Sequence, residues 1–136
     1  GLPVASVADL AGRRVARRQP SAGAGLLLSH LLEREGVRDV AFLDELSRTE
    51  TDAAVAVASG KADAAPGLEA IARQFGLAFV PTMRERFDLL VDRRAWFEPP
   101  MQALLGFARS SAFAAKARDL GGYDVAGLGT VRWNAP

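Results

Sequence analysis

The fold of this chain is decided by the stretch Arg17-Arg18-Gln19-Pro20-Ser21-Ala22-Gly23-Ala24-Gly25. It joins a predicted strand, residues 14–18, to an apolar helix that we expect to begin near Ala22. The first residues of such a helix have unpaired backbone N–H groups, and the helix dipole places partial positive charge there. Small residues let an anion approach these donors, and Arg17 and Arg18 can add charge. The stretch therefore predicts an anion site. The alternative is a plain strand-to-helix turn packed against its sheet.

Predicted strands and helices alternate along the rest of the chain. After a short helical turn that opens at a predicted capping box (6–9), the expected strands are 14–18, 37–43, 61–65, 77–80 and 84–91, and the expected helices are 22–35, 49–59, 68–75, 99–109 and 112–120. This order is typical of an α/β fold with a mostly parallel sheet and helices on both faces. The apolar run 77–80 indicates a strand buried on both faces.

Three predicted helix starts follow predicted strands, near Ser21, Thr49 and Pro66. In parallel sheets, ligands bind at the carboxyl ends of the strands, so these starts would share one rim. Threonine hydroxyls at a helix start most often cap the helix, and those of Thr49 and Thr51 could also face a ligand. Asp63 follows a strand and could act on a ligand, although a lone aspartate there usually caps or pairs locally.

Composition excludes several functional classes. The 136 residues suit one globular domain, and 17 basic against 16 acidic residues argue against non-specific nucleic-acid binding. There is no cysteine, and no apolar run approaches the roughly 18 residues that span a bilayer. We find no phosphate-binding loop, no hydrolase serine motif and no zinc motif, and His30 has no partner at ligand spacing. We therefore expect no catalytic residue, metal or cofactor.

Several short segments, in this order, resemble one known family. They are 18–24 (RQPSAGA), 58–63 (ASGKAD), 67–72 (GLEAIA), 79–81 with 85–89 (FVP and ERFDL), and 121–124 (GGYD). Together they resemble the periplasmic-binding-protein-like domain of the molybdate-binding type. That domain occurs in bacteria fused to helix-turn-helix regulators or molybdopterin-biosynthesis proteins, and it is similar to the periplasmic molybdate receptors of transporters.

The resemblance implies a type II binding-protein fold, in which two α/β lobes close on a ligand. This chain would supply one lobe, a return strand around residues 87–91 and the closing helices, as a single domain (1–136) with a loose tail at 125–136. The chain begins at Gly1 without a methionine, so we expect a piece of a longer chain from which the first lobe is largely missing. The family's anion loop often reads Gly-Ser-Gly-Thr-Arg where this chain has residues 21–25. Backbone donors survive this difference, but the threonine and arginine side chains are absent.

The sequence thus predicts a sensor domain for a small anion, either a molybdate-like oxyanion or a carboxylate. The expected ligand-binding residues are Arg18, Ser21, Ala22, Gly23, Thr49, Thr51 and Asp63. Closure of a partner lobe would regulate an attached helix-turn-helix or cofactor-biosynthesis domain. We expect this domain itself to contact neither nucleic acid nor a membrane. A homodimer is one possible assembly. This role implies the cytoplasm. The alternatives are a periplasmic transporter receptor, an interaction or oligomerisation module, and an enzyme dependent on Asp63.

Overall fold

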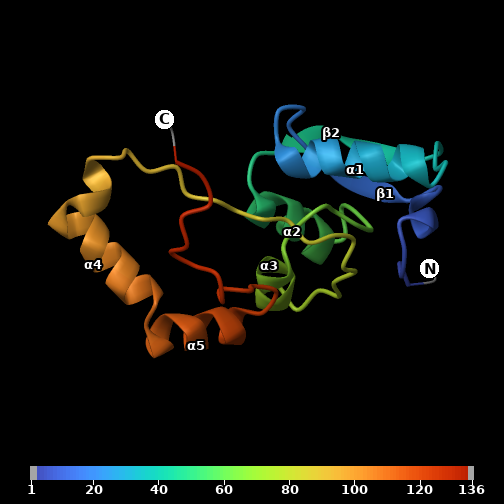
Figure 1. The fold of residues 1–136 in the computed structure, drawn as a ribbon. Coiled ribbons are helices and arrows are strands. Elements are labelled where there is room, and N and C mark those ends of the chain that lie inside the picture. Colours follow the sequence, from blue (N-terminus) through green and yellow to red (C-terminus); the bar gives the residue numbers. More distant parts are fainter. Residues whose placement is uncertain (1–2, 135–136) are drawn as a thin grey trace. The chain divides into compact units, whose positions relative to one another are not determined.

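The computed structural model describes residues 3–134 of the chain. Contacts divide the chain into two compact units, 1–84 and 85–136, and each is described by itself. The first unit contains η1 (Ala8–Leu10), β1 (Arg14–Arg18), α1 (Gly23–Arg34), β2 (Ala41–Ser47), α2 (Glu50–Ala58) and α3 (Glu69–Gln74) (Figure 1). The second contains η2 (Ala95–Phe97), α4 (Pro99–Ala108) and α5 (Ser111–Leu120).

The sheet of the first unit is parallel, as the sequence predicts. β1 pairs with β2, so that Arg14 lies opposite Ala41 and Arg18 opposite Ser47. On its other edge β1 forms a parallel bridge through Val15 to Ala64. β1 is therefore the central strand. β2 begins and ends about four residues later than predicted, and the expected strand 61–65 is reduced to this single bridge.

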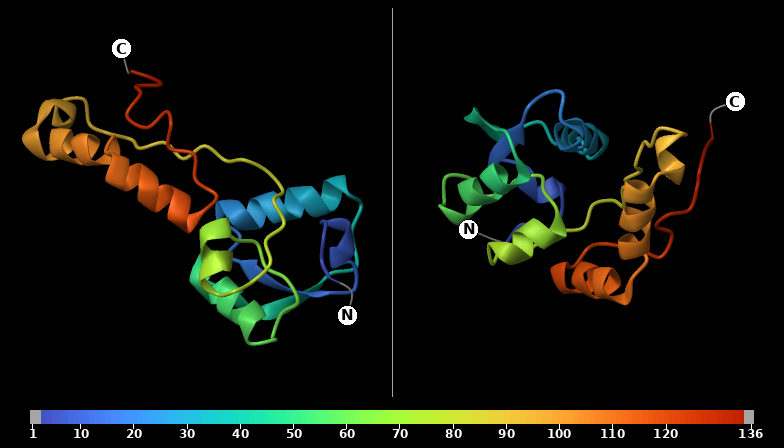
Figure 2. Two further views of the ribbon diagram at one scale, coloured as in Figure 1. Left: turned by 90° about the horizontal axis from the view of Figure 1, so that it is seen from below. Right: turned by 90° about the vertical axis from the view of Figure 1, so that its left-hand side faces the viewer.

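Helices cover both faces of β1. Val15 is 1% exposed and packs in one cluster with Leu28 and Leu32 of α1. Ala16 is completely buried and points to the opposite face, because successive strand residues alternate. On that face lies α2, which contacts β1 and buries its own alanines. Figure 2 shows α1 and α2 on opposite sides of the strands. The α/β class with two covered faces is thus confirmed for this unit.

Two predicted strands are absent from the described residues. The segments 77–80 and 84–91 have no regular secondary structure, and no backbone N–H from residue 78 to residue 91 donates a hydrogen bond within the described part. Phe87 is 88% exposed and Leu90 98% exposed. The prediction of buried or paired strands here was wrong because a strand needs a neighbour for its backbone hydrogen bonds, and no described strand lies beside these segments.

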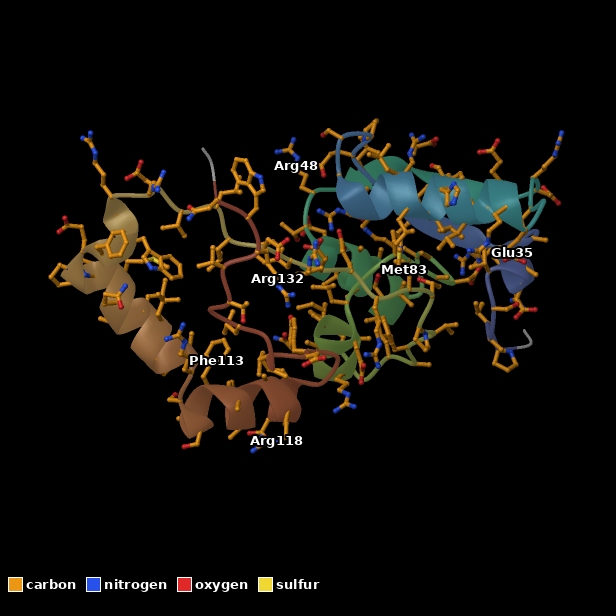
Figure 3. All side chains as sticks on the ribbon, viewed as in Figure 1. Glu35, Arg48, Met83, Phe113, Arg118 and Arg132 are labelled. Carbon is orange, nitrogen blue, oxygen red and sulfur yellow. The ribbon has the colours of Figure 1, made fainter. Side chains whose placement is uncertain are left out.

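The helices of the second unit begin at the predicted signals. Pro99 occupies the first turn of α4. Ser110 caps α5, since its hydroxyl oxygen accepts a hydrogen bond from the Phe113 N–H at 3.2 Å. The rings of Phe107 and Phe113 meet edge to face with centroids 5.6 Å apart, which joins α4 to α5; Phe113 is labelled in Figure 3. A single domain and a loose tail at 125–136 stay predictions.

Candidate functional site

The candidate site is the edge of the sheet where both strands end. β1 ends at Arg18 and the chain turns into α1, while β2 ends at Ser47 and the chain turns into α2. Arg18 and Ser47 are partners in the register of the parallel pair, so the two helix starts follow strand ends at the same edge. This is the edge at which parallel α/β sheets bind ligands. We call it the rim, and it consists of residues 17–24 and 44–52.

The start of α1 leaves backbone donors free. The Ala22 N–H donates to the Gln19 carbonyl at 2.9 Å, which closes the turn. Within the described residues, the N–H groups of Ser21, Gly23 and Ala24 donate no hydrogen bond. Ala22 occupies the N-cap position and provides no side-chain oxygen to satisfy them. Because Ser21 and Gly23 are exposed, these donors are available to a ligand.

Gly25 explains why this turn needs small residues. A Cβ atom at Gly25 would lie 3.1 Å from the Gln19 carbonyl oxygen and 3.6 Å from the Arg18 Cβ. The first turn of α1 therefore lies directly against the end of β1. The packing explanation applies to Gly25, whereas a Cβ at Gly23 would meet nothing within 4 Å.

The start of α2 is closed by a capping box. The Thr49 hydroxyl oxygen accepts from the Asp52 N–H at 3.0 Å, and the Asp52 carboxylate accepts from the Thr49 N–H at 2.9 Å and the Arg48 N–H at 3.1 Å. The hydrogen bond from the Thr49 backbone is the main cause that lowers the pKa of Asp52. The capping role predicted for Thr49 is confirmed. The Thr51 side chain is exposed, and its hydroxyl forms no hydrogen bond within the described residues.

Arg18 links the two helix starts. Its main chain lies against α1 at Gly25, and its side chain, only 8% exposed, reaches α2. The Nη1 atom lies 2.6 Å from a carboxylate oxygen of Glu50, and Nη2 donates to the Arg48 carbonyl at 3.1 Å. The Nε and Nη1 atoms are buried and neither donates an aligned hydrogen bond among the described residues, so Nη1 is joined to Glu50 by the ion pair alone. The guanidinium of Arg18 is the main cause that lowers the pKa of Glu50.

An open hollow lies beside this pair. It is lined by Gln19 after β1 and by Glu45, Leu46 and Arg48 at the end of β2. In Figure 3 the labelled Arg48 side chain lies at the end of the unit where α1 begins. The hollow thus has one arginine and one carboxylate in its lining, and the unpaired N–H donors at the start of α1 lie at the same edge of the sheet.

Asp63 is placed away from the rim. Its carboxylate pairs with Arg14, with 2.7 Å between Arg14 Nη2 and Asp63 Oδ1, and it also accepts from the Arg14 N–H at 2.9 Å. The hydrogen bond from the Arg14 side chain is the main cause that lowers the pKa of Asp63 to about 2. Arg14 begins β1 and Arg18 ends it, so roughly 13 Å of strand separates them. The sequence analysis gave capping or local pairing as the usual role of such an aspartate, and the structure shows Asp63 paired with Arg14.

The sequence did not single out Glu50. In the sequence Glu50 is visible only as an acidic residue directly after a threonine N-cap. Such a residue normally indicates no more than a favourable interaction with the helix dipole. Its pairing with Arg18, 32 positions earlier, depends on the register of β1 against β2. Of the seven predicted site residues, six lie at the rim and Asp63 does not.

Residues 3–134 contain neither a cluster of metal-binding side chains nor a membrane-spanning helix. In that range, no group of three or more histidine, aspartate or glutamate residues is arranged to hold a metal ion. None of the described helices has the length and apolar character required to cross a bilayer.

Comparison with known proteins identifies the family. The model of the PBP-like domain, a periplasmic-binding-protein (PBP) superfamily domain, matches residues 1–109. This chain belongs to that superfamily, whose domains bind ligands, and the predicted resemblance to a periplasmic-binding-protein-like domain is confirmed. No solved structure matches significantly.

Two curated relatives are similar to this chain. One is an uncharacterized protein in the 5′ region of a 2Fe-2S ferredoxin gene of Clostridium pasteurianum, 32% identical over 76 residues, or 55% of this chain and 67% of the relative. The other is the uncharacterized protein YvgK of Bacillus subtilis (strain 168), 29% identical over 120 residues, or 87% of this chain. The chain spans only 38% of the length of YvgK.

Proposed function

We propose that this chain is the ligand-sensing part of a larger protein and that it binds a small anion at the rim. The superfamily supports ligand binding in general. The observation that favours an anionic ligand is the burial of Arg18 at the carboxyl end of the central strand. Its side chain is 8% exposed, and its Nε has no hydrogen-bond partner among the described residues. A buried arginine with open donor capacity beside two helix starts attracts negative charge.

Each rim residue has a distinct role in this proposal. Backbone N–H groups of Ser21 and Gly23, with Ala22 between them, donate to the ligand. Thr51 adds its hydroxyl, and Thr49 keeps its cap while its O–H proton stays available. Arg18 acts through its charge, because Glu50 and a carbonyl already occupy its two Nη atoms. No step requires covalent chemistry, so we propose a binding module and not an enzyme.

Binding would be transmitted by closure of a second lobe over the rim. A ligand that contacts both lobes shifts the population toward the closed form, and an attached helix-turn-helix or cofactor-biosynthesis domain would respond to that shift. Such a regulator would act in the cytoplasm, whereas a transporter receptor would act in the periplasm. Molybdate remains one oxyanion to be tested, together with carboxylates.

The experiment is an amide NMR titration of this chain with acetate, sulfate and molybdate in separate series. Shifts confined to the amides of residues 21–24 and of Thr51 would support the rim, and weak binding in the millimolar range is detectable by this method. The Arg18→Gln variant is the matched test, and it should lose the response. Absence of any shift at these amides, in both this chain and its full-length parent, would refute the proposal.

One observation favours a second candidate, an interaction or oligomerisation module. In the second unit large apolar side chains are exposed, including Phe87 at 88%, Phe97 at 76% and Trp133 at 76%. Where such side chains gather in one patch, they mark a contact with another polypeptide. Light scattering that shows a stable oligomer indifferent to every anion would favour this candidate over the sensor.

A further inference from the structure

The carboxylate of Glu50 occupies the place where an external anion would meet Arg18. Glu50 is the first residue of α2, so its charge lies at the positive end of that helix dipole. Its oxygen is 2.6 Å from Arg18 Nη1, and its side chain is 38% exposed whereas that of Arg18 is 8% exposed. Of the two paired groups, the carboxylate is thus the more accessible to solvent.

We propose that Glu50 sets the ligand class of the rim: it admits ligands with a single negative charge, such as carboxylates, and disfavours dianionic oxyanions such as sulfate and molybdate. This inference rests on the proposed function, namely that the rim binds an anion. It assigns the selectivity to a residue that does not itself donate to the ligand.

The charges around the rim support this assignment. The rim contains three arginines (Arg17, Arg18 and Arg48) and four acidic residues (Asp44, Glu45, Glu50 and Asp52), of which Arg18 and Glu50 form an ion pair. The acidic side chains therefore offset the attraction of the arginines for a second negative charge. Repulsion by Glu50 counts twice for a dianion and once for a monoanion. The pairing with Arg18 also lowers the pKa of Glu50, so its negative charge persists at neutral pH.

The test compares Glu50→Gln with a matched control outside the rim, Glu33→Gln, at neutral pH. Glu33 is an exposed carboxylate in the last turn of α1, and the ion pair of Arg18 is with Glu50. Amide titrations with sulfate, molybdate and acetate would give the affinities. Removing Glu50 should strengthen sulfate and molybdate binding about tenfold and acetate binding about threefold, since the dianion experiences twice the interaction. The control should change each affinity about twofold or less, because solvent screens an exposed charge.

A second measurement guards against misfolding. Glu50→Gln leaves Arg18 buried without its counter-ion, which is destabilising. Sulfate should then raise the thermal unfolding midpoint of Glu50→Gln more than that of the unaltered chain. The double variant Arg18→Gln/Glu50→Gln lacks both charges and should show no such extra rise. An equal rise in the double variant would overturn the inference.

The remaining outcomes separate the inference from the proposed function. If the unaltered chain binds acetate at residues 21–24 and Glu50→Gln adds no preference for dianions, the inference fails and the proposed function stands. If the unaltered chain binds no anion while Glu50→Gln binds sulfate, the role of Glu50 holds and the proposed function fails. Tight binding of molybdate by the unaltered chain overturns the inference.

Discussion

The capping box of α2 allows a stability prediction with a built-in control. In Thr49→Ala the Asp52 N–H loses its acceptor, which lies at 3.0 Å, while the reciprocal bond from the Thr49 N–H to Asp52 is retained. Loss of a threonine N-cap costs about 1 kcal/mol of the free energy of unfolding. The Thr51 hydroxyl is exposed and forms no hydrogen bond within the described residues, so Thr51→Ala should cost less than about 0.5 kcal/mol.

Urea unfolding followed by circular dichroism measures both variants. With a denaturant slope of about 1.5 kcal/mol/M, the Thr49→Ala midpoint should fall by about 0.7 M while the slope stays unchanged. The order should be reversed for acetate binding. Thr51→Ala should weaken it more than Thr49→Ala, because the Thr51 hydroxyl is free to contact a ligand. Equal midpoints for the two variants, or a larger loss for Thr51→Ala, would refute the capping argument and with it the assignment of roles at this helix start.

Three further predictions test the first unit and the segment after it. Val15→Ala should cost about 2 kcal/mol, because Val15 is 1% exposed in the core, whereas Val55→Ala at 46% exposure should change stability by less than about 0.5 kcal/mol in the same urea assay. The pKa of Asp63 is lowered to about 2 when folded and is about 4 when unfolded. The stability from this carboxylate is therefore complete above about pH 4 and is lost as the pH falls toward 2. Urea midpoints against pH should fall over that window, and less steeply in Asp63→Asn. Leu90→Ser should change the free energy of unfolding by less than about 0.5 kcal/mol, since Leu90 is 98% exposed; a large loss would show that this segment is buried in a strand after all.

The location of the candidate site was predictable from the sequence, but the ion pairs formed by its charged residues were not. The strand-to-helix stretch 17–25, its free N–H groups and the Thr49 cap all follow from residues within a few positions of one another. The neutralisation of Arg18 by Glu50 and the removal of Asp63 to the far end of β1 do not, because each depends on which strand lies beside β1 and in which register.

The sequence by itself determined the class of fold and the starts of the helices. Caps such as Thr49 and Ser110, a helix-starting Pro99 and a helix-ending Gly36 with a φ of 68° act through local hydrogen bonds and backbone conformation, so they hold wherever the segment lies. Only the tertiary structure decided which apolar segments became strands. Residues 84–91 have a strand-like composition, yet no described strand lies beside them to accept their backbone hydrogen bonds. A helix satisfies its backbone within one segment, whereas a strand and a buried ion pair need a partner that is distant in the sequence.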